Sequence, residues 1–351
     1  MPKLLHPNFK SLITTLLFLA IIQSTLNSCS KSSPSPNKPP VKTGTNVYVV
    51  GIYYTQNMTP VAAYWKDGVL HKLVTDTTIE SFATGIAIKD TNVYICGAIK
   101  GTAVYWKNGA LTTIAADAEA EAITVSGNDV YLAGINYINR NYVAAYWKNN
   151  TLFSIGDTTL MATPTSIAVN GSDVYVVAQE YDTKSSYNSL VLWKNGIKSS
   201  IYSNNSGRAI NTLAINGSDV YITGDINYFS SNNGSQAILW KNGKLDFIYQ
   251  PATASISGTN TITINNNIIY LAGYSNSKAV YWSSSDNFYT EHDLTSSSQY
   301  IATGITFNKT DMYIAGNEQT TLTSNAVYWK NGTMVKLTNN SYTSGIGVVQ
   351  Y

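Results

Sequence analysis

The stretch AVYWKNG, from Ala103 to Gly109, decides the fold because close copies of it recur along the chain. Each copy has a Trp at the same place, and these are all seven Trp residues of the protein: Trp65, Trp106, Trp147, Trp193, Trp240, Trp282 and Trp329. A second recurring stretch, VYICG and its relatives, precedes each copy and is marked by Tyr48, Tyr94, Tyr131, Tyr175, Tyr221, Tyr270 and Tyr313. These Tyr residues follow one another at intervals of 37 to 49 residues, so the sequence is an array of seven repeats.

Each repeat has the pattern of four short β-strands. The unit at 85–114, GIAIKDTNVYICGAIKGTAVYWKNGALTTI, divides into GIAI, NVYICG, TAVYWK and ALTTI. Tight polar turns join the first strand to the second and the third to the fourth, and the Asn-Gly of KNG favours a hairpin with positive φ angles. Helical repeats of this length would show apolar residues at a 3.6-residue period, whereas these show β-branched and aromatic runs. The pattern predicts an all-β, seven-bladed β-propeller with four-stranded blades.

The two ends of the repeat array predict how the ring closes. The first copy begins at NVYVVG and lacks the strand that comes first in every other copy. After the seventh copy the chain ends in SGIGVVQY, in which Ser344 to Val349 matches the missing strand. We therefore expect residues 45–351 to form one propeller, closed by a C-terminal strand that completes the first blade.

The N-terminus has the features of an export signal. Lys3 and Lys10 precede the apolar run LITTLLFLAII, which is too short for a comfortable membrane span. The following Leu26-Asn27-Ser28-Cys29 resembles the lipobox of bacterial lipoproteins, with Asn27 in place of the usual small residue. This resemblance implies a signal peptide at 1–28 and lipidation of Cys29. The alternative is a plain secretory signal with an incidental Cys.

Residues 29–44 follow as the lipidated Cys and a Pro- and Ser-rich tether. With its VYxxG and AxYWKNG repeats, the mature chain resembles bacterial seven-bladed propeller lipoproteins of the cell envelope. That resemblance implies a lipid-anchored envelope protein, at the outer membrane, with the side of the membrane left open. It implies no activity.

Composition narrows the possible partners. Charged residues make up only 12% of the chain, and Lys3 and Lys10 fall in the leader, so the mature chain has as many basic as acidic residues. Binding of nucleic acid needs a basic surplus on one face, so no nucleic-acid partner is expected. We expect a monomer.

Tyr residues outside the repeat pattern predict a binding face. In a four-stranded blade, the second-to-third strand loops and the connections between blades lie on one face. The longest consecutive run of these loops is in the third, fourth and fifth blades. The loops hold Tyr53, Tyr54, Tyr137, Tyr142, Tyr181, Tyr187, Tyr228 and Tyr274. Tyr with Ser, Asn and Gly is typical of adaptable recognition surfaces. We expect a glycan or an envelope protein to bind through Tyr137, Arg140, Tyr142, Tyr181, Tyr187, Tyr228 and Phe229.

The central channel gives a second set of candidates. The residues just before the innermost strands are Thr84, Glu121, Thr165, Asn211, Asn260, Thr303 and Ser344. This polar ring, with Glu121 and Asn211 as its candidate ligand-binding members, could hold a small ligand at the channel mouth. Ordinary turn chemistry explains the same residues.

Catalysis has little support in the sequence. His6 lies in the leader, and neither His71 nor His292 has a partner at metal-ligand spacing, so no metal or cofactor is expected. Cys96 occupies a small core position. The chain is therefore interpreted as a non-catalytic recognition module. The alternative is a carbohydrate-active hydrolase or lyase that uses Glu121, Glu180 or Asp225, and a third interpretation is a purely structural envelope protein.

Overall fold

The computed structural model describes residues 44–139, 141–185, 187–204, 208–228, 234–248, 256–285, 288–297, 299–320 and 323–351. At 187, 203–204, 208–210, 227–228 and 246–247 it describes the backbone alone. The signal peptide, Cys29 and most of the tether therefore lie outside the described residues. No helix of a length and hydrophobicity able to cross a bilayer occurs in the described ranges.

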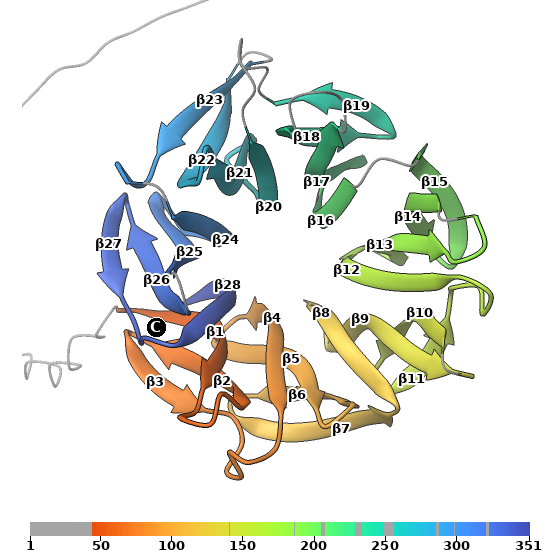
Figure 1. The fold of residues 1–351 in the computed structure, drawn as a ribbon, viewed down its shortest axis with the longest axis horizontal. Coiled ribbons are helices and arrows are strands. Elements are labelled where there is room, and N and C mark those ends of the chain that lie inside the picture. Colours follow the sequence, from red (N-terminus) through yellow and green to blue (C-terminus); the bar gives the residue numbers. More distant parts are fainter. Residues whose placement is uncertain are drawn as a thin grey trace, which may run out of the picture. The chain divides into compact units, whose positions relative to one another are not determined.

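The propeller consists of seven four-stranded antiparallel sheets arranged around a centre (Figure 1). Blade one contains β28 (Ser341–Gln350), β1 (Thr45–Tyr54), β2 (Pro60–Lys66) and β3 (Val69–Lys72). Blade two contains β4 (Ser81–Lys89), β5 (Asn92–Ile99), β6 (Thr102–Lys107) and β7 (Ala110–Ala116). Blade three contains β8 (Ala118–Ser126), β9 (Asp129–Ile138), β10 (Asn141–Lys148) and β11 (Thr151–Ser154).

The remaining four blades repeat this order from the innermost strand outward. Blade four contains β12 (Met161–Asn170), β13 (Asp173–Asp182), β14 (Tyr187–Lys194) and β15 (Ile197–Asn204). Blade five contains β16 (Arg208–Asn216), β17 (Asp219–Tyr228), β18 (Gly234–Lys241) and β19 (Lys244–Phe247). Blade six contains β20 (Ser257–Asn265), β21 (Ile268–Ser275), β22 (Lys278–Ser285) and β23 (Phe288–Asp293). Blade seven contains β24 (Tyr300–Asn308), β25 (Asp311–Gln319), β26 (Ser324–Lys330) and β27 (Thr333–Lys336).

The C-terminal strand closes the ring, as the sequence predicts. β28 pairs antiparallel with β1, from Thr45 opposite Gln350 to Tyr53 opposite Ser341. The innermost strand of blade one therefore comes from the other end of the chain (Figure 1). This pairing satisfies the backbone groups of β1 that would otherwise form an open sheet edge. The predicted seven-bladed, all-β fold is confirmed.

The seven Trp residues fill the interfaces between blades. Every one of them is less than 2% exposed. Each belongs to a hydrophobic cluster that combines residues of two neighbouring blades; Trp193 of blade four, for example, packs with Ala133 and Tyr146 of blade three. Because a sheet buried on both faces has few polar side chains in its middle strands, this packing explains why the middle strands of the repeat are largely apolar.

The recurring Asn of the KNG turns has two roles. Asn108 has a φ of 51° and Gly109 a φ of 85°, which are the positive angles expected of such a hairpin. In addition, Asn108 Oδ1 accepts a hydrogen bond of 2.9 Å from the backbone N–H of Val93. The same contact is made by Asn149, Asn195, Asn242 and Asn331. The turn between the outer strands thus fastens the start of the second strand.

The polar ring at the channel is built by β-bulges. In each innermost strand the register shifts by one residue, and the extra residue is the one predicted to line the channel, such as Glu121 between Ala120 and Ala122. Several of these residues donate hydrogen bonds to a carbonyl of the next blade: Thr84 to Ala120 (2.6 Å), Asn211 to Thr259 (2.6 Å), Asn260 to Ala302 (2.7 Å) and Ser344 to Ala83 (2.5 Å). Hydrogen bonds from part of this polar ring therefore join neighbouring blades.

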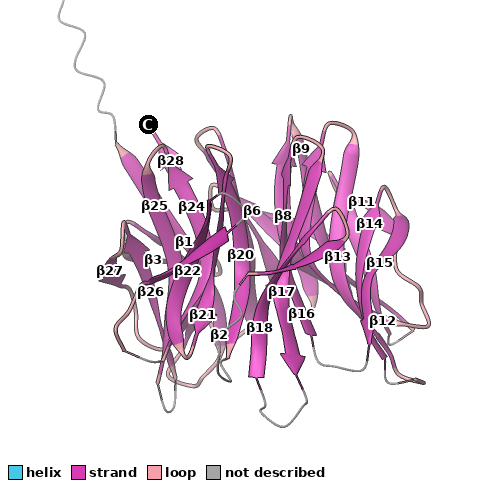
Figure 2. Cartoon of the chain, turned by 90° about the horizontal axis from the view of Figure 1, so that it is seen from above, coloured by secondary structure: helices cyan, strands magenta, loops and turns pink. Residues whose placement is uncertain are grey.

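The strands run side by side between two faces of the propeller (Figure 2). One face holds the loops between second and third strands and the connections between blades; we call it the loop face. The other holds the tight turns and is the turn face. The starts of the innermost strands and the ends of the second strands lie at the loop face, and this is where the candidate site is built.

Candidate ligand-binding cleft

A cleft of about 520 Å³ opens on the loop face where blades six, seven and one meet. We call it the loop-face cleft. The described residues that line it are Ile256, Asn260, Tyr274, Ser277, Ile301, Thr303, Gln319, Tyr342, Thr343 and Ser344. Asn260, Thr303 and Ser344 are the bulge residues of three consecutive innermost strands. The cleft therefore extends from the loops toward the channel.

Tyr274 forms one aromatic wall of this cleft and is held from two sides. It lies at the end of β21, opposite Gly258 in the register of the sheet. Its ring occupies the space above Gly258, where any larger residue would collide with it. Burial, followed by the charge of Asp225, raises the pKa of the Tyr274 phenol, and a hydrogen bond with Ser235 acts in the opposite direction. The ring thus packs over Gly258 and forms part of the cleft wall.

Tyr342 forms the second aromatic wall, near the start of β28. It is 38% exposed, so part of its ring is open to solvent. Burial of the rest of the side chain raises the pKa of its phenol, with a smaller contribution from Tyr54. Since Tyr274 belongs to blade six and Tyr342 to blade one, the two walls are separated by blade seven.

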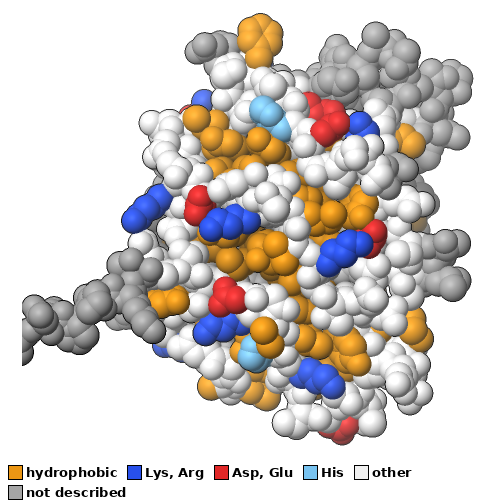
Figure 3. Space-filling view, turned by 90° about the vertical axis from the view of Figure 1, so that its left-hand side faces the viewer, with side chains coloured by type: hydrophobic (Ala, Val, Ile, Leu, Met, Phe, Trp, Pro, Cys, Tyr) orange, Lys and Arg blue, Asp and Glu red, His pale blue; other side chains and the backbone are white. Residues whose placement is uncertain are grey.

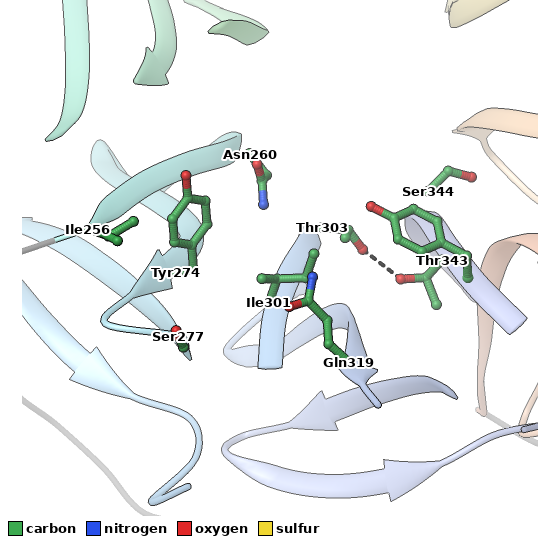
Figure 4. A pocket seen from close by; sticks show the side chains of 10 residues that line it. Ile256, Asn260, Tyr274, Ser277, Ile301, Thr303, Gln319, Thr343 and Ser344 are labelled. Carbon is green, nitrogen blue, oxygen red and sulfur yellow. Dashed lines mark hydrogen bonds between the residues drawn. The ribbon is translucent and has the colours of Figure 1, made fainter. Parts of the chain in front are cut away.

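Uncharged polar groups lie between the two Tyr residues. Asn260 uses its Nδ2 to bind the Ala302 carbonyl, which leaves its Oδ1 as an acceptor. The hydroxyls of Thr303 and Thr343 are 2.7 Å apart and hydrogen-bonded to each other (Figure 4). Gln319, at the end of β25, and Ile301 complete this part of the wall (Figure 4). No charged side chain lines the cleft among the described residues.

The Tyr residues predicted in blade three pack against each other. Tyr137 and Tyr142 are opposite in the β9–β10 register, and their rings meet edge to face with centroids 5.0 Å apart. Burial, then a hydrogen bond to Glu119 and its charge, raises the pKa of Tyr137. In blade four, Tyr181 is 38% exposed. Arg140 and Phe229 lie outside the described residues, as do the side chains of Tyr187 and Tyr228.

The predicted channel residues Glu121 and Asn211 have different surroundings. Glu121 is partly buried, and desolvation, with the neighbouring Glu119 charge second, raises its pKa to about 7. Asn211 donates its Nδ2 hydrogen to the Thr259 carbonyl of the next blade, so it has a structural role in the ring.

The three carboxylates of the enzyme alternative have separate environments. Glu180 is 3% exposed and forms an ion pair with Lys198. Asp225 is 9% exposed; burial raises its pKa to about 6, and its charge acts on Tyr274. The charged neighbour of Glu121 is Glu119. Across the described ranges, no three His, Cys, Asp or Glu side chains are grouped as metal ligands would be. Cys96 is fully buried, which raises the pKa of its thiol to about 12.

Comparisons with known proteins place the fold. No protein-family model matches the chain, and no curated protein sequence matches it. Among solved structures, a puromycin-hydrolysing peptidase of Mycobacterium tuberculosis aligns with a TM-score of 0.58 at 8% identity, over 84% of this chain and 52% of its own. This chain thus spans about half the length of that peptidase. At this identity the likeness shows the propeller fold alone.

A second solved structure shares the fold but differs in how the ring closes. The β-propeller domain of the trilobed protease from Pyrococcus furiosus aligns with a TM-score of 0.50 at 8% identity, over 84% of this chain and 92% of that domain. That domain is described as having an open velcro topology. The present chain differs, because β28 closes blade one by pairing with β1.

Sequence reasoning named four of the cleft residues: Tyr274 among the loop Tyr residues, and Asn260, Thr303 and Ser344 in the channel ring. It did not name Ile256, Ser277, Ile301, Gln319, Tyr342 and Thr343. Of these six, Tyr342 is the one that the sequence could best have indicated, because the prediction that β28 completes blade one also places the start of β28 beside blade seven. The other five have no distinctive sequence pattern and are brought together by the packing of adjacent blades.

Proposed function

We propose that this protein is a non-catalytic recognition module of the cell envelope that binds a neutral glycan in the loop-face cleft. The observation that supports it most is the pairing of two aromatic walls, Tyr274 and Tyr342, with amide and hydroxyl groups between them and no described charged lining. The cleft volume of about 520 Å³ is in the range of ordinary small-ligand sites.

The chemistry of the lining favours a sugar over other ligands. A pyranose ring has an apolar face that can stack on a Tyr ring, and hydroxyls that both donate and accept hydrogen bonds. Asn260 and Gln319 offer both functions, and Thr303 adds a hydroxyl. The Thr343 hydroxyl, in contrast, is fully buried and bonded to Thr303 and Asn317. An anionic or cationic ligand would lose its hydration without gaining a counter-charge, which is costly. The ligand is therefore an uncharged oligosaccharide.

The anchor at Cys29 completes this proposal. Lipidation there, as the lipobox resemblance implies, would hold the protein at the envelope membrane. The Pro-rich segment at 30–44 would then keep the propeller clear of the lipid surface. A module of this kind concentrates a glycan at the membrane without needing a catalytic group.

A glycan-array screen of the purified protein tests the proposal. Hits should be neutral oligosaccharides, and Tyr274→Ala and Tyr342→Ala should each weaken binding by roughly tenfold or more, because stacking on an aromatic ring contributes about 1 kcal/mol beyond area burial. Tyr142→Ala and Tyr181→Ala are matched controls in blades three and four. If these controls lose binding while the cleft variants keep it, the ligand binds at the third to fifth blades and the cleft assignment is wrong.

A further inference from the structure

Six of the seven blades hold a Lys ammonium over the ring of the landmark Tyr. In blade three, Lys148 Nζ lies 5.4 Å from the centroid of the Tyr131 ring. The other pairs are Lys66 with Tyr48 (5.7 Å), Lys107 with Tyr94 (5.2 Å), Lys194 with Tyr175 (5.3 Å), Lys241 with Tyr221 (5.2 Å) and Lys330 with Tyr313 (5.4 Å). These distances are those of cation–π contacts.

In four of these blades a carboxylate also binds the ammonium. Asp129 Oδ2, two residues before Tyr131, is 2.9 Å from Lys148 Nζ. Asp173, Asp219 and Asp311 make the equivalent ion pairs with Lys194, Lys241 and Lys330. The repeat therefore builds a site in which an aromatic face and a carboxylate hold the ammonium of its own Lys.

Blade six lacks both charged groups of this arrangement. Ser283 pairs with Tyr270 in the β21–β22 register, where the other six copies have Lys. Ile268 stands two residues before Tyr270, in the place of the Asp. The short Ser283 side chain turns to His292, with 3.0 Å between Oγ and Nε2. The ring of Tyr270 is thus left without the lysine of its own repeat.

A pocket of about 530 Å³ lies at this place, at the turn-face end of the interface between blades six and seven. We call it the aromatic pocket. Four aromatic rings line it: Tyr270 and Phe307 are 4.6 Å apart between centroids, and Tyr281 and His292 stack at 4.5 Å with an angle of 12°. Leu294 and Met312 add apolar lining. Figure 3 shows this flank of the propeller, where hydrophobic side chains form bands between separate charged groups.

The charge in the lining is already paired. Asp293 is a lining residue, and its Oδ2 lies 2.8 Å from Lys278 Nζ. A primary ammonium donates three N–H groups, and the Asp that accepts one of them in blades three, four, five and seven is replaced here by Ile268. Blades one and two, with Asn46 and Asn92 at that place, hold their Lys over the ring without it. A quaternary ammonium has no N–H and is held by aromatic faces alone.

We infer that the aromatic pocket binds a small quaternary ammonium compound, whose cationic head takes the place over Tyr270 that Lys occupies in the other blades. This inference is independent of the glycan proposal, because the aromatic pocket is lined by turn-face residues such as Thr310, Asn331 and Gly332. The two sites share no described lining residue.

Calorimetric titration of the full-length protein tests this inference. The probes are choline and 3,3-dimethylbutan-1-ol, which have the same shape and differ in the positive charge. Choline should bind roughly tenfold more tightly, because the neutral compound gains apolar contact but no cation–π attraction. Equal affinity for the two probes, or no heat of binding with choline at tens of millimolar, would overturn the inference.

Two variants and one control locate the site. Ser283→Lys restores the repeat residue and should abolish choline binding while raising the thermal midpoint, since the new ammonium lies over Tyr270. Tyr270→Leu removes the ring that holds Lys in the other blades and should lower choline affinity several-fold, with Phe307, Tyr281 and His292 still lining the pocket. Tyr274→Ala, in the loop-face cleft, should leave choline affinity unchanged. Choline affinity that is unaltered by Ser283→Lys in a folded protein would place the cation elsewhere and refute the assignment.

Discussion

The ring of Tyr274 lies directly over Gly258, so close that a Cβ on Gly258 would be 2.6 Å from the Tyr274 hydroxyl oxygen and 2.7 Å from its Cε1. The two residues face each other across β20 and β21. A missing side chain on one strand therefore sets the position of an aromatic ring on the next. The relationship links the sequence of blade six to the shape of the loop-face cleft.

Gly258→Ala should therefore weaken glycan binding as strongly as Tyr274→Ala does. The added methyl group forces the ring away from its position, and such overpacking typically costs about 1–3 kcal/mol of stability. Chemical denaturation and glycan titration measure the two effects. The double variant Gly258→Ala/Tyr274→Ala should regain most of the lost stability without regaining binding. A Gly258→Ala protein with normal affinity would show that the ring position does not matter for the ligand.

Removal of β28 should open the ring. A chain that ends at Asn340 leaves β1 as an unpaired edge and takes Ile346 away from the cluster that surrounds Trp65. We expect calorimetry to show a loss of the single cooperative transition, and light scattering to show self-association through the exposed edge. A peptide of residues 338–351, added in excess, should restore the transition. A truncated chain that unfolds at the wild-type temperature would contradict the closure role of β28.

Glu121 should make the stability of the propeller depend on pH. Its pKa is raised from 4.5 to about 7 in the folded protein, mainly by burial. Between these values the folded state holds a proton that the unfolded chain has released, so stability falls as pH rises from about 4.5 to about 7. Glu121→Gln has no such proton and should exceed the wild type by on the order of 1–3 kcal/mol above pH 7, with little difference near pH 4. Urea denaturation at pH 4, 6 and 8 measures this, and parallel curves for the two proteins would refute the raised pKa.

Cys29→Ala should release the protein from the membrane. If Cys29 carries the lipid anchor, the variant should appear in the soluble envelope fraction and fail to incorporate labelled palmitate. Cys96→Ala is the matched control, since Cys96 is buried in the propeller and should affect neither measurement. Unchanged membrane association of Cys29→Ala would favour the plain secretory signal.

The repeat made most of the fold predictable from the sequence. Trp and Tyr recur because each fills an equivalent space between blades, and the Asn-Gly turns and the split first blade follow from local rules. The strands of the unit at 85–114 are found as predicted, although β4 begins at Ser81. The innermost strand of this blade, β4, starts earlier than predicted because a β-bulge at Thr84 lets its pairing with β5 continue from Gly85 back to Ser81.

The loop-face cleft was less predictable from the sequence, because it depends on which blades place their non-repeated residues side by side. Loop length favoured the third to fifth blades, whereas the loop-face cleft is formed by blades six, seven and one. Tyr274 and Asn260 were visible as individual candidates, but their common cleft with Tyr342 arises only once β28 lies beside blade seven. The aromatic pocket depends on Ser283, which stands where the other six copies have Lys. This difference is recognised only when all seven copies are compared.

The most direct test of the account is a crystal structure of the protein with the neutral oligosaccharide that binds best on the array. The account predicts sugar density in the loop-face cleft, with a ring against Tyr274 or Tyr342 and hydroxyls within hydrogen-bond distance of Asn260 or Gln319. Density over Tyr137, Tyr142 or Tyr181 with the cleft empty would contradict it.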